Sequence, residues 1–171
     1  MIESAVRETI VLGAGNLSMG DDGLGPAVLR RLEEDWQLPA EVRLVDGGVW
    51  GIALLPVIEE ARRLILVDAI TAGDAPGTPV ELSREALPTR YGVRLSPHQV
   101  DLRDVFALAV LRGTLPAEAV AIGLEPESCS WGDDLSAPVA AGVDVIAERV
   151  VAQLQAWGHR CPRRRPAACM S

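Results

Sequence analysis

The residues best suited to chemistry in this chain are Asp22, Asp68 and His98, which stand in three separate polar sites. Asp22 belongs to GDDG after the run TIVLGAGN, Asp68 follows LILV, and His98 lies in SPHQ. Apolar runs of this length are typical of buried parallel strands, and the ligands of such sheets gather at the carboxyl ends of the strands. If all three segments end at one edge, two carboxylates and an imidazole converge on one cation. That donor set suits a borderline divalent ion such as Ni²⁺ or Zn²⁺.

Each of these residues also has a purely structural interpretation. Asp21 and Asp22 would act as helix caps, because an aspartate at a helix N-terminus accepts orphan N–H bonds and complements the dipole. Capping needs only one carboxylate, and the flanking glycines let the backbone approach a bound object, so both interpretations stay open. Asp68 would accept hydrogen bonds from amides of residues 69–73, since a buried carboxylate needs partners. His98 would be a solvated loop histidine.

The segment GAGNLSMGDDGLG also invites comparison with a dinucleotide-binding loop. The G-x-G-x-x-G fingerprint fails, because Ser18 stands where the third glycine is needed. Two carboxylates at a helix N-terminus would also repel a pyrophosphate. Asp46, in LVDGG, lies farther along the chain from the glycine-rich loop than a ribose-binding acid does. It either lines the same crevice as Asp22 and Asp68 or makes the turn after its strand. We therefore predict no cofactor-binding residue and keep a nucleotide-binding oxidoreductase only as an alternative.

Composition narrows the class of protein. The chain has 171 residues, 49% of them hydrophobic, and a formal net charge of −8, which predicts one domain with a substantial core. Its acidity argues against a nucleic-acid partner, because phosphate neutralisation needs clustered Lys and Arg. Three cysteines without C-x-x-C spacing predict no disulfide framework and a reducing compartment. With no signal-peptide pattern and no membrane-spanning window, we expect a cytoplasmic protein without a membrane partner.

The elements that must position these residues follow from hydrophobic periodicity. The pattern predicts strands over residues 9–14, 42–46, 63–69 and 119–124, a short edge strand over 79–82, and helices over 23–36, 50–61, 101–113 and 136–157. This order predicts an α/β fold, a single three-layer sandwich with a mainly parallel twisted five-stranded sheet and helices on both faces. The domain is expected to span residues 1–158, with a disordered basic tail over 159–171.

Five segments, in this order and spacing, closely resemble the hydrogenase maturation endopeptidases: GAGNLSMGDDGLGP, LVDGG, LILVDAI, APGT and SPHQ. The resemblance runs from about residue 9 to residue 158. It implies a peptide hydrolase of aspartic type that trims the C-terminal extension from the large-subunit precursor of a nickel–iron hydrogenase. The family fold it implies is an α/β sandwich with a five-stranded sheet.

The resemblance also implies roles for individual residues. Asp22, Asp68 and His98 fall on the metal-contacting trio, and Asp22 and Asp46 are the implied catalytic acids. The implied metal is nickel carried by the substrate, for which zinc or cadmium would substitute. A bound cation polarises a carbonyl and lowers the pKa of water, and an aspartate in the crevice would act as general base. A non-catalytic metallochaperone that checks for nickel with the same three ligands remains an alternative.

Overall fold

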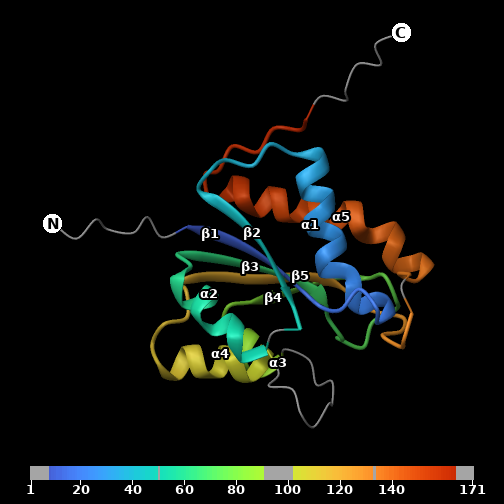
Figure 1. Ribbon diagram of the computed structural model, residues 1–171, viewed down its shortest axis with the longest axis horizontal. Helices are drawn as coiled ribbons and strands as arrows, with labels where there is room; N and C mark the ends of the chain where they lie inside the picture. Colours follow the sequence, from blue (N-terminus) through green and yellow to red (C-terminus); the bar gives the residue numbers. More distant parts are fainter. Residues whose placement is uncertain (1–7, 50, 91–101, 133, 165–171) are drawn as a thin grey trace, which may run out of the picture.

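The computed structural model describes residues 8–49, 51–90, 102–132 and 134–164, which form one sheet between two layers of helices (Figure 1). The strands are β1 (Thr9–Ala14), β2 (Val42–Gly48), β3 (Arg63–Ala69), β4 (Pro79–Ser83) and β5 (Glu118–Leu124). The helices are α1 (Leu24–Asp35), α2 (Leu55–Glu60), α3 (Leu87–Arg90), α4 (Leu102–Leu111) and α5 (Ala137–Ala156), with short 3-10 helices η1 (Gly20–Gly23) and η2 (Gly51–Leu54). No helix among these residues is long and apolar enough to cross a membrane.

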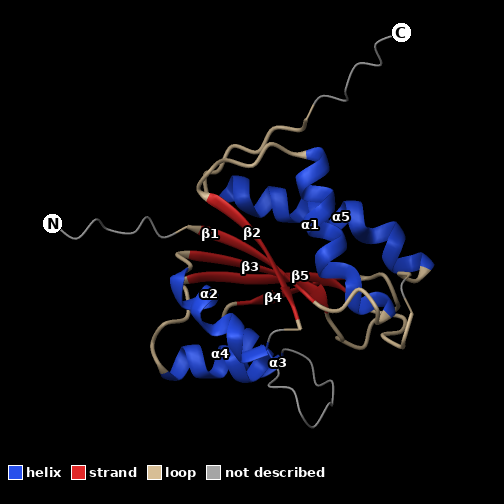
Figure 2. Cartoon of the chain, viewed as in Figure 1, coloured by secondary structure: helices blue, strands red, loops and turns tan. Residues whose placement is uncertain are grey.

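The sheet has the strand order β2-β1-β3-β5-β4, in which only β4 runs antiparallel to its neighbour. Pro79 begins this edge strand, where its missing N–H removes no hydrogen bond from the interior of the sheet. The predicted fold class is confirmed: the sheet has five strands, is mainly parallel and carries helices on both faces (Figure 2).

Alternating side chains of the central strands build two apolar cores. In β3, Leu64 and Leu66 belong to the core under α2, α3 and α4, whereas Ile65 and Val67 belong to the core under α1 and α5. All four side chains are fully buried. This burial on both faces explains why β3 is an uninterrupted apolar run in the sequence.

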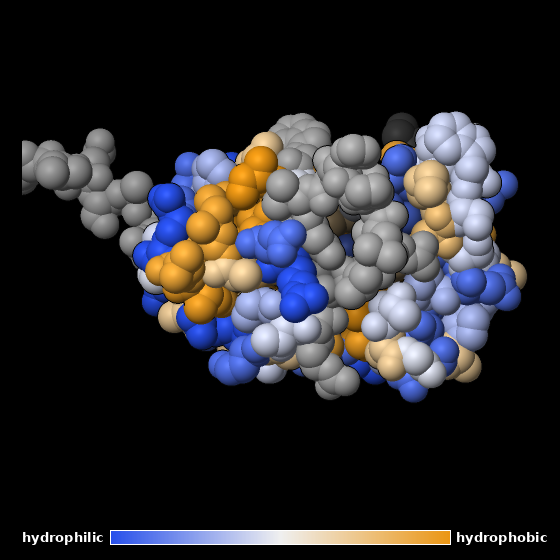
Figure 3. Space-filling model, turned by 90° about the horizontal axis from the view of Figure 1, so that it is seen from below, coloured by the Kyte–Doolittle hydropathy of each residue, from blue (hydrophilic) through white to orange (hydrophobic). Residues whose placement is uncertain are grey.

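The outer surface of the α4 layer is partly apolar, and orange side chains gather there when the molecule is viewed from below (Figure 3). Val110 and Leu111, at the end of α4, are two of the exposed large hydrophobic residues, and Leu111 is 84% exposed. They lie at the end of a helix that leads into the amino end of β5, away from the carboxyl edge of the sheet.

The carboxyl ends of the parallel strands lie at one edge, as the sequence predicts. Gly13 of β1 is level with Asp46 of β2 and Val67 of β3, and Asp68 is level with Gly123 of β5. The segments that follow these strands therefore start side by side. This edge, called the carboxyl edge below, is where a site would form.

The prediction of a disordered tail from residue 159 is wrong for residues 159–164. Cys161 is buried, the backbone of Pro162 accepts a hydrogen bond from Gln37, and the guanidinium of Arg163 lies 4.8 Å from the ring centre of Trp36. Composition alone suggests disorder here, but the ring of Trp36 offers the arginine a stacking surface. Residues 165–171 lie outside the described part of the chain.

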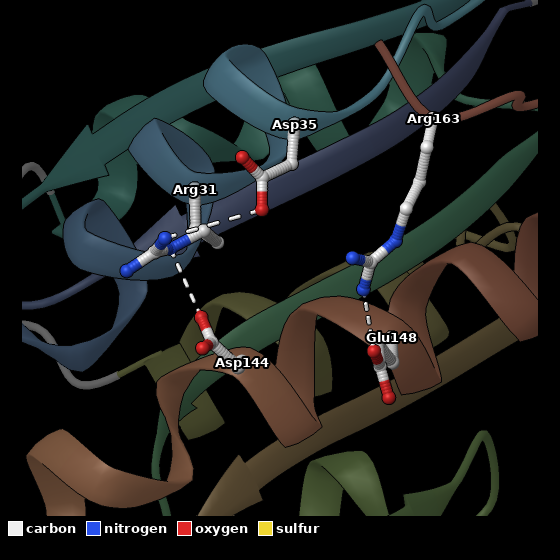
Figure 4. A network of polar contacts seen from close by, with 5 residues as sticks. All are labelled: Arg31, Asp35, Asp144, Glu148 and Arg163. Carbon is white, nitrogen blue, oxygen red and sulfur yellow. Dashed lines mark hydrogen bonds and ion pairs between the residues drawn. The ribbon is translucent and has the colours of Figure 1, made fainter. Parts of the chain in front are cut away.

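The docked tail and two helices are joined by surface ion pairs (Figure 4). Arg31 of α1 lies 3.0 Å from Asp144 of α5, and Arg163 lies 2.6 Å from Glu148 on the same helix. All four side chains are well exposed to solvent, so each pair contributes only about 0.5 kcal/mol. The apolar contacts beneath them account for most of the stability of this layer.

Candidate functional site

Three predicted carboxylates are brought to the carboxyl edge. Asp22 lies in η1 directly after β1, Asp46 lies near the end of β2, and Asp68 is the second-last residue of β3. Asp68 is buried, with 8% of its surface exposed, whereas Asp22 is half-buried and Asp46 is exposed. Exposure of the three acids to solvent therefore increases from Asp68 on the central strand β3 to Asp46 on the edge strand β2.

Asp22 and Asp68 meet across Gly15. A Cβ at Gly15 would lie 1.7 Å from the carbonyl oxygen of Asp22 and 3.5 Å from Oδ1 of Asp68. Gly15 also has a φ of 120°, which side chains rarely adopt. The absence of a side chain at this position lets η1 fold back onto the end of β3 and brings these two acidic residues together.

The carboxylate of Asp22 helps to fix this turn. Its Oδ2 accepts a hydrogen bond of 2.8 Å from the backbone N–H of Asn16. The N-cap residue of α1 is Gly23, and that of η1 is Met19, and neither makes a side-chain capping bond. The capping interpretation is therefore wrong for Asp22, which ties its helical turn back to the loop after β1.

Asp68 and Asp46 each accept a local amide hydrogen bond. Oδ1 of Asp68 accepts the N–H of Ala69 at 2.7 Å, and Oδ1 of Asp46 accepts the N–H of Gly48 at 3.0 Å. The structural interpretation of each residue is thus partly correct, since both acids shape the turns they begin. A carboxylate has two oxygens with about four acceptor positions, so the exposed carboxylate of Asp46 can also accept from a water or a substrate amide.

Asp21 is a structural residue whose role the sequence reasoning missed. It is fully buried, and its carboxylate accepts hydrogen bonds from the backbone N–H groups of Glu127, Ser128 and Ser136 and from the Ser136 hydroxyl. Burial alone would raise the pKa of Asp21, but these hydrogen bonds outweigh it and hold the pKa below its ordinary value. Asp21 is therefore a buried anion that fastens the loop after β5 to η1.

Glu125 is a second buried carboxylate that fastens a loop through backbone hydrogen bonds. It is buried, follows β5 directly, and its Oε2 accepts the N–H groups of Ala72, Gly73 and Asp74 at 2.6 to 3.3 Å. The structural interpretation from the sequence has Asp68 accept the amides of residues 69–73. In the described part of the chain, Asp68 accepts the N–H of Ala69, and Glu125 accepts the amides of residues 72–74. The signal was present in the sequence, because Glu125 follows an apolar strand just as Asp68 ends one.

The predicted ligand His98 lies outside the described residues, so its convergence with Asp22 and Asp68 stays a prediction. Within the described part of the chain, no three His, Cys, Asp or Glu side chains form a group that holds a metal ion. The two carboxylates nonetheless have the chemistry that a divalent cation requires, because each offers anionic oxygen donors near a shared turn.

Comparison with known proteins agrees with this architecture. The family model described as hydrogenase maturation protease matches residues 26–153, a range that contains Asp46, Asp68 and His98 and begins just after Asp22. The hydrogenase expression/formation protein HupD of Rhodobacter capsulatus is 40% identical over 154 residues, which cover 89% of this chain and 73% of that protein. The hydrogenase 2 maturation protease of Escherichia coli is 34% identical over 150 residues, covering 87% of this chain and 92% of that protein.

A solved structure with a similar fold extends the likeness to three dimensions. The hydrogenase maturating endopeptidase HybD from Escherichia coli superposes with a TM-score of 0.85 at 33% sequence identity. The match covers 92% of this chain and 98% of that structure. The sheet, both helical layers and the carboxyl edge are thus shared over nearly the whole described chain.

Proposed function

This chain belongs to the hydrogenase maturation protease family and is a peptide hydrolase, and from this premise we propose that it trims the large-subunit precursor of a nickel–iron hydrogenase. The bond cleaved is the one that joins the C-terminal extension to a subunit already loaded with nickel. The nickel enters the site as part of the substrate. The names of the similar proteins support a role in hydrogenase maturation. The requirement that the precursor already carry nickel rests on the carboxylates of the candidate site, which attract a cation.

The observation that carries this proposal is the gathering of Asp22, Asp46 and Asp68 at one edge of the sheet, with Asp22 and Asp68 meeting over Gly15. Peptide hydrolysis needs a base that activates water and a positive charge that stabilises the developing oxyanion. Carboxylates supply the base directly. They also attract the cation that supplies the positive charge.

We assign distinct roles to the acids. Asp22 and Asp68, together with His98, would contact the substrate's nickel, which polarises the scissile carbonyl when it is present. Asp46 is the accessible acid and would take the proton from the attacking water, with Asp22 as the second catalytic acid of an aspartic-type reaction. Zinc or cadmium would substitute for nickel as contacted ions, because both accept carboxylate and imidazole donors.

The dependence on nickel gives the site a checking function. A precursor without metal would lack the charge that orients its scissile bond, so cleavage would wait for metal insertion. We place the reaction in the cytoplasm, a reducing compartment in which a cysteine outside any disulfide, such as Cys161, is common.

The test is incubation of the purified precursor with this protein, with and without nickel, followed by intact-mass measurement of the product. We expect loss of the C-terminal extension from the nickel-loaded precursor alone. Cleavage that ignores the metal would contradict the checking role. Tight binding of the loaded precursor without any cleavage by the wild-type protein would instead support a non-catalytic metallochaperone.

A further inference from the structure

Large apolar side chains stand exposed around the candidate site. Seven large hydrophobic residues of the described chain are conspicuously exposed, and four of them lie in the segments that leave the carboxyl edge. These four are Leu17 after β1, Val49 and Ile52 after β2, and Trp131 after β5. We call this set the apolar rim. Exposed apolar side chains gathered around a functional site mark a surface that binds another molecule.

Trp131 is the most prominent member of the rim, with 84% of its surface exposed. Tryptophan is the residue type most enriched among energetic hot spots of protein interfaces, because it buries a large area with few rotatable bonds. Solvent exposure of this side chain is unfavourable for the free protein. A bound partner would remove that cost.

The loop that presents Trp131 is fastened in place. Next to it, the backbone of Gly132 pairs with residues 18 and 20 through hydrogen bonds of 3.1 Å and 2.7 Å. The buried carboxylate of Asp21 holds Glu127 and Ser128 on one side of the tryptophan and Ser136 on the other. An anchor on a pre-ordered loop loses little conformational freedom when a partner binds.

Leu17 connects the rim to the catalytic acids. It lies two residues after Gly15, and it lines a pocket of about 270 Å³ together with Asp46. Apolar side chains of α1 and β2, including Leu29 and Leu44, line the same pocket. A polypeptide bound in this pocket would contact both Leu17 and Asp46, so the rim and the site can serve one ligand.

Charge identifies the kind of segment that fits. The four segments that leave the carboxyl edge cover residues 15–23, 46–54, 68–78 and 125–136, and they contain no Lys or Arg, although the whole chain has 16. Their exposed acidic residues in the described chain are Asp46, Asp74, Glu127 and Asp134. Arg30 of α1 lines the pocket beside Asp46, where Glu33 accompanies it. A surface that joins apolar anchors to an excess of negative charge is complementary to a segment that is apolar and positively charged.

We propose that the precursor docks on the apolar rim through an apolar segment of net positive charge, with Trp131 as the main anchor and Leu17 as the second. This inference rests on the proposed function, because it takes the occupant to be the polypeptide that is cleaved. Docking at the rim brings the scissile bond to Asp22, Asp46 and Asp68. The rim thereby selects the substrate, while the acids act on it.

The test measures KM, kcat and Kd for the nickel-loaded precursor with the wild type and with Trp131→Ala, Leu17→Ala and Leu111→Ala. Leu111 is the matched control, because it has the same exposed fraction as Trp131 but lies at the end of α4. We expect Trp131→Ala to raise KM and Kd about tenfold or more and Leu17→Ala about threefold, with kcat and the Leu111→Ala values unchanged. Added salt should weaken binding of the wild type, because it screens the attraction between opposite charges.

Several outcomes separate this inference from the function it rests on. If the wild type cleaves the precursor and Trp131→Ala has an unchanged KM and Kd, the docking inference is overturned and the function stands. If the wild type binds without cleaving and Trp131→Ala weakens the binding, docking stands and the peptidase assignment fails. A Kd that does not respond to salt would overturn the charge complementarity of the docked segment.

Discussion

A methyl group at Gly15 would lie 1.7 Å from the carbonyl oxygen of Asp22, much closer than any allowed contact. On the other side of Asp68, a methyl group at Gly123 would lie 1.9 Å from the Asp68 backbone oxygen. Glycines thus flank the buried acid on both sides, Gly15 in the segment after β1 and Gly123 on β5. The site depends on these close backbone approaches as much as on the acids themselves.

Gly15→Ala should therefore separate Asp22 from Asp68 and abolish cleavage. It should also destabilise the fold by about 2–4 kcal/mol, because it combines an unfavourable φ with a clash. Urea unfolding and cleavage assays measure the two effects. The control is Gly113→Ala, where φ is also positive at 68° but no atom lies within 4 Å, so about 1 kcal/mol is expected. Equal effects of the two variants on cleavage would contradict the role of Gly15.

Sequence reasoning at the residue scale could predict that Asp22, Asp46 and Asp68 lie at one edge of the sheet, because each stands at or near the end of an apolar run. It could not separate Asp21 from Asp22, since adjacent acids look alike until the fold shows that one points to a distant loop. The hydrogen bonds of Asp21 reach residues more than 100 positions away. No local pattern encodes such a contact.

At the scale of elements, the buried carboxylates of Asp21 and Glu125 organise the loops of the carboxyl edge. Asp21 in η1 holds the loop after β5, and Glu125 after β5 holds residues 72–74. Each carboxylate satisfies several backbone N–H groups that would otherwise be buried without partners. The loops around the candidate site are thereby ordered by two buried charges to which we assign no role in cleavage.

Asp21→Asn should lower the free energy of unfolding by about 2–4 kcal/mol at neutral pH, because an amide places an NH₂ group against N–H donors. Since the folded state holds the pKa of Asp21 below its ordinary value of 3.8, the wild type has the full contribution above pH 3.8. It loses that contribution as the pH falls through the folded-state pKa. The free energy of unfolding, measured with urea at about pH 7 and about pH 3, should therefore fall less on acidification for Asp21→Asn than for the wild type.

Asp144→Asn is the matched control, because Asp144 is exposed and pairs only at the surface with Arg31. Its effect should stay within about 0.5 kcal/mol. A loss of stability on acidification that is the same in Asp21→Asn and the wild type would contradict the assignment of Asp21 as a buried anion.

The main elements follow from periodicity alone. β1 and β3 begin and end where the pattern predicts, and α1, α4 and α5 differ from the predicted ranges by one or two residues. The 3-10 helix η1 and the four-residue helix α3 were not predicted, because one turn carries no measurable period. The interval 50–61 was predicted as one helix, and it divides into η2 and α2 near Pro56.

At the scale of the whole molecule, residues 159–164 close the layer formed by α1 and α5. Arg164 donates to the backbone oxygens of Asp35 and Trp36, and Cys161 is buried in the core beneath. The composition of the tail, which is rich in arginine and proline, is typical of a disordered segment and does not predict this packing. The tail is ordered by contacts with Trp36 and Glu148, which belong to other parts of the chain. The sequence of the tail itself therefore does not indicate these contacts.

Truncation after Gly158 should therefore lower the free energy of unfolding by about 2–4 kcal/mol, since it removes a buried thiol side chain, a cation–π contact and several hydrogen bonds. Truncation after Arg164 keeps all of these contacts, so that shortened chain should be more stable than the one that ends at Gly158. Thermal or urea unfolding of the two shortened chains distinguishes them. Equal stability of both would show that the docked tail contributes nothing.

The central claim is that acids drawn from separate strands act together on a nickel-loaded precursor. It is tested most directly by the intact mass of that precursor after incubation with Asp22→Asn, and with Asp144→Asn as a control. Asp144 lies exposed on α5, where it pairs with Arg31, and it is not among the residues that line the pocket of Asp46. We predict that the precursor keeps its full mass with Asp22→Asn and loses its C-terminal extension with Asp144→Asn and the wild type. Trimming by Asp22→Asn at the wild-type rate would contradict the account.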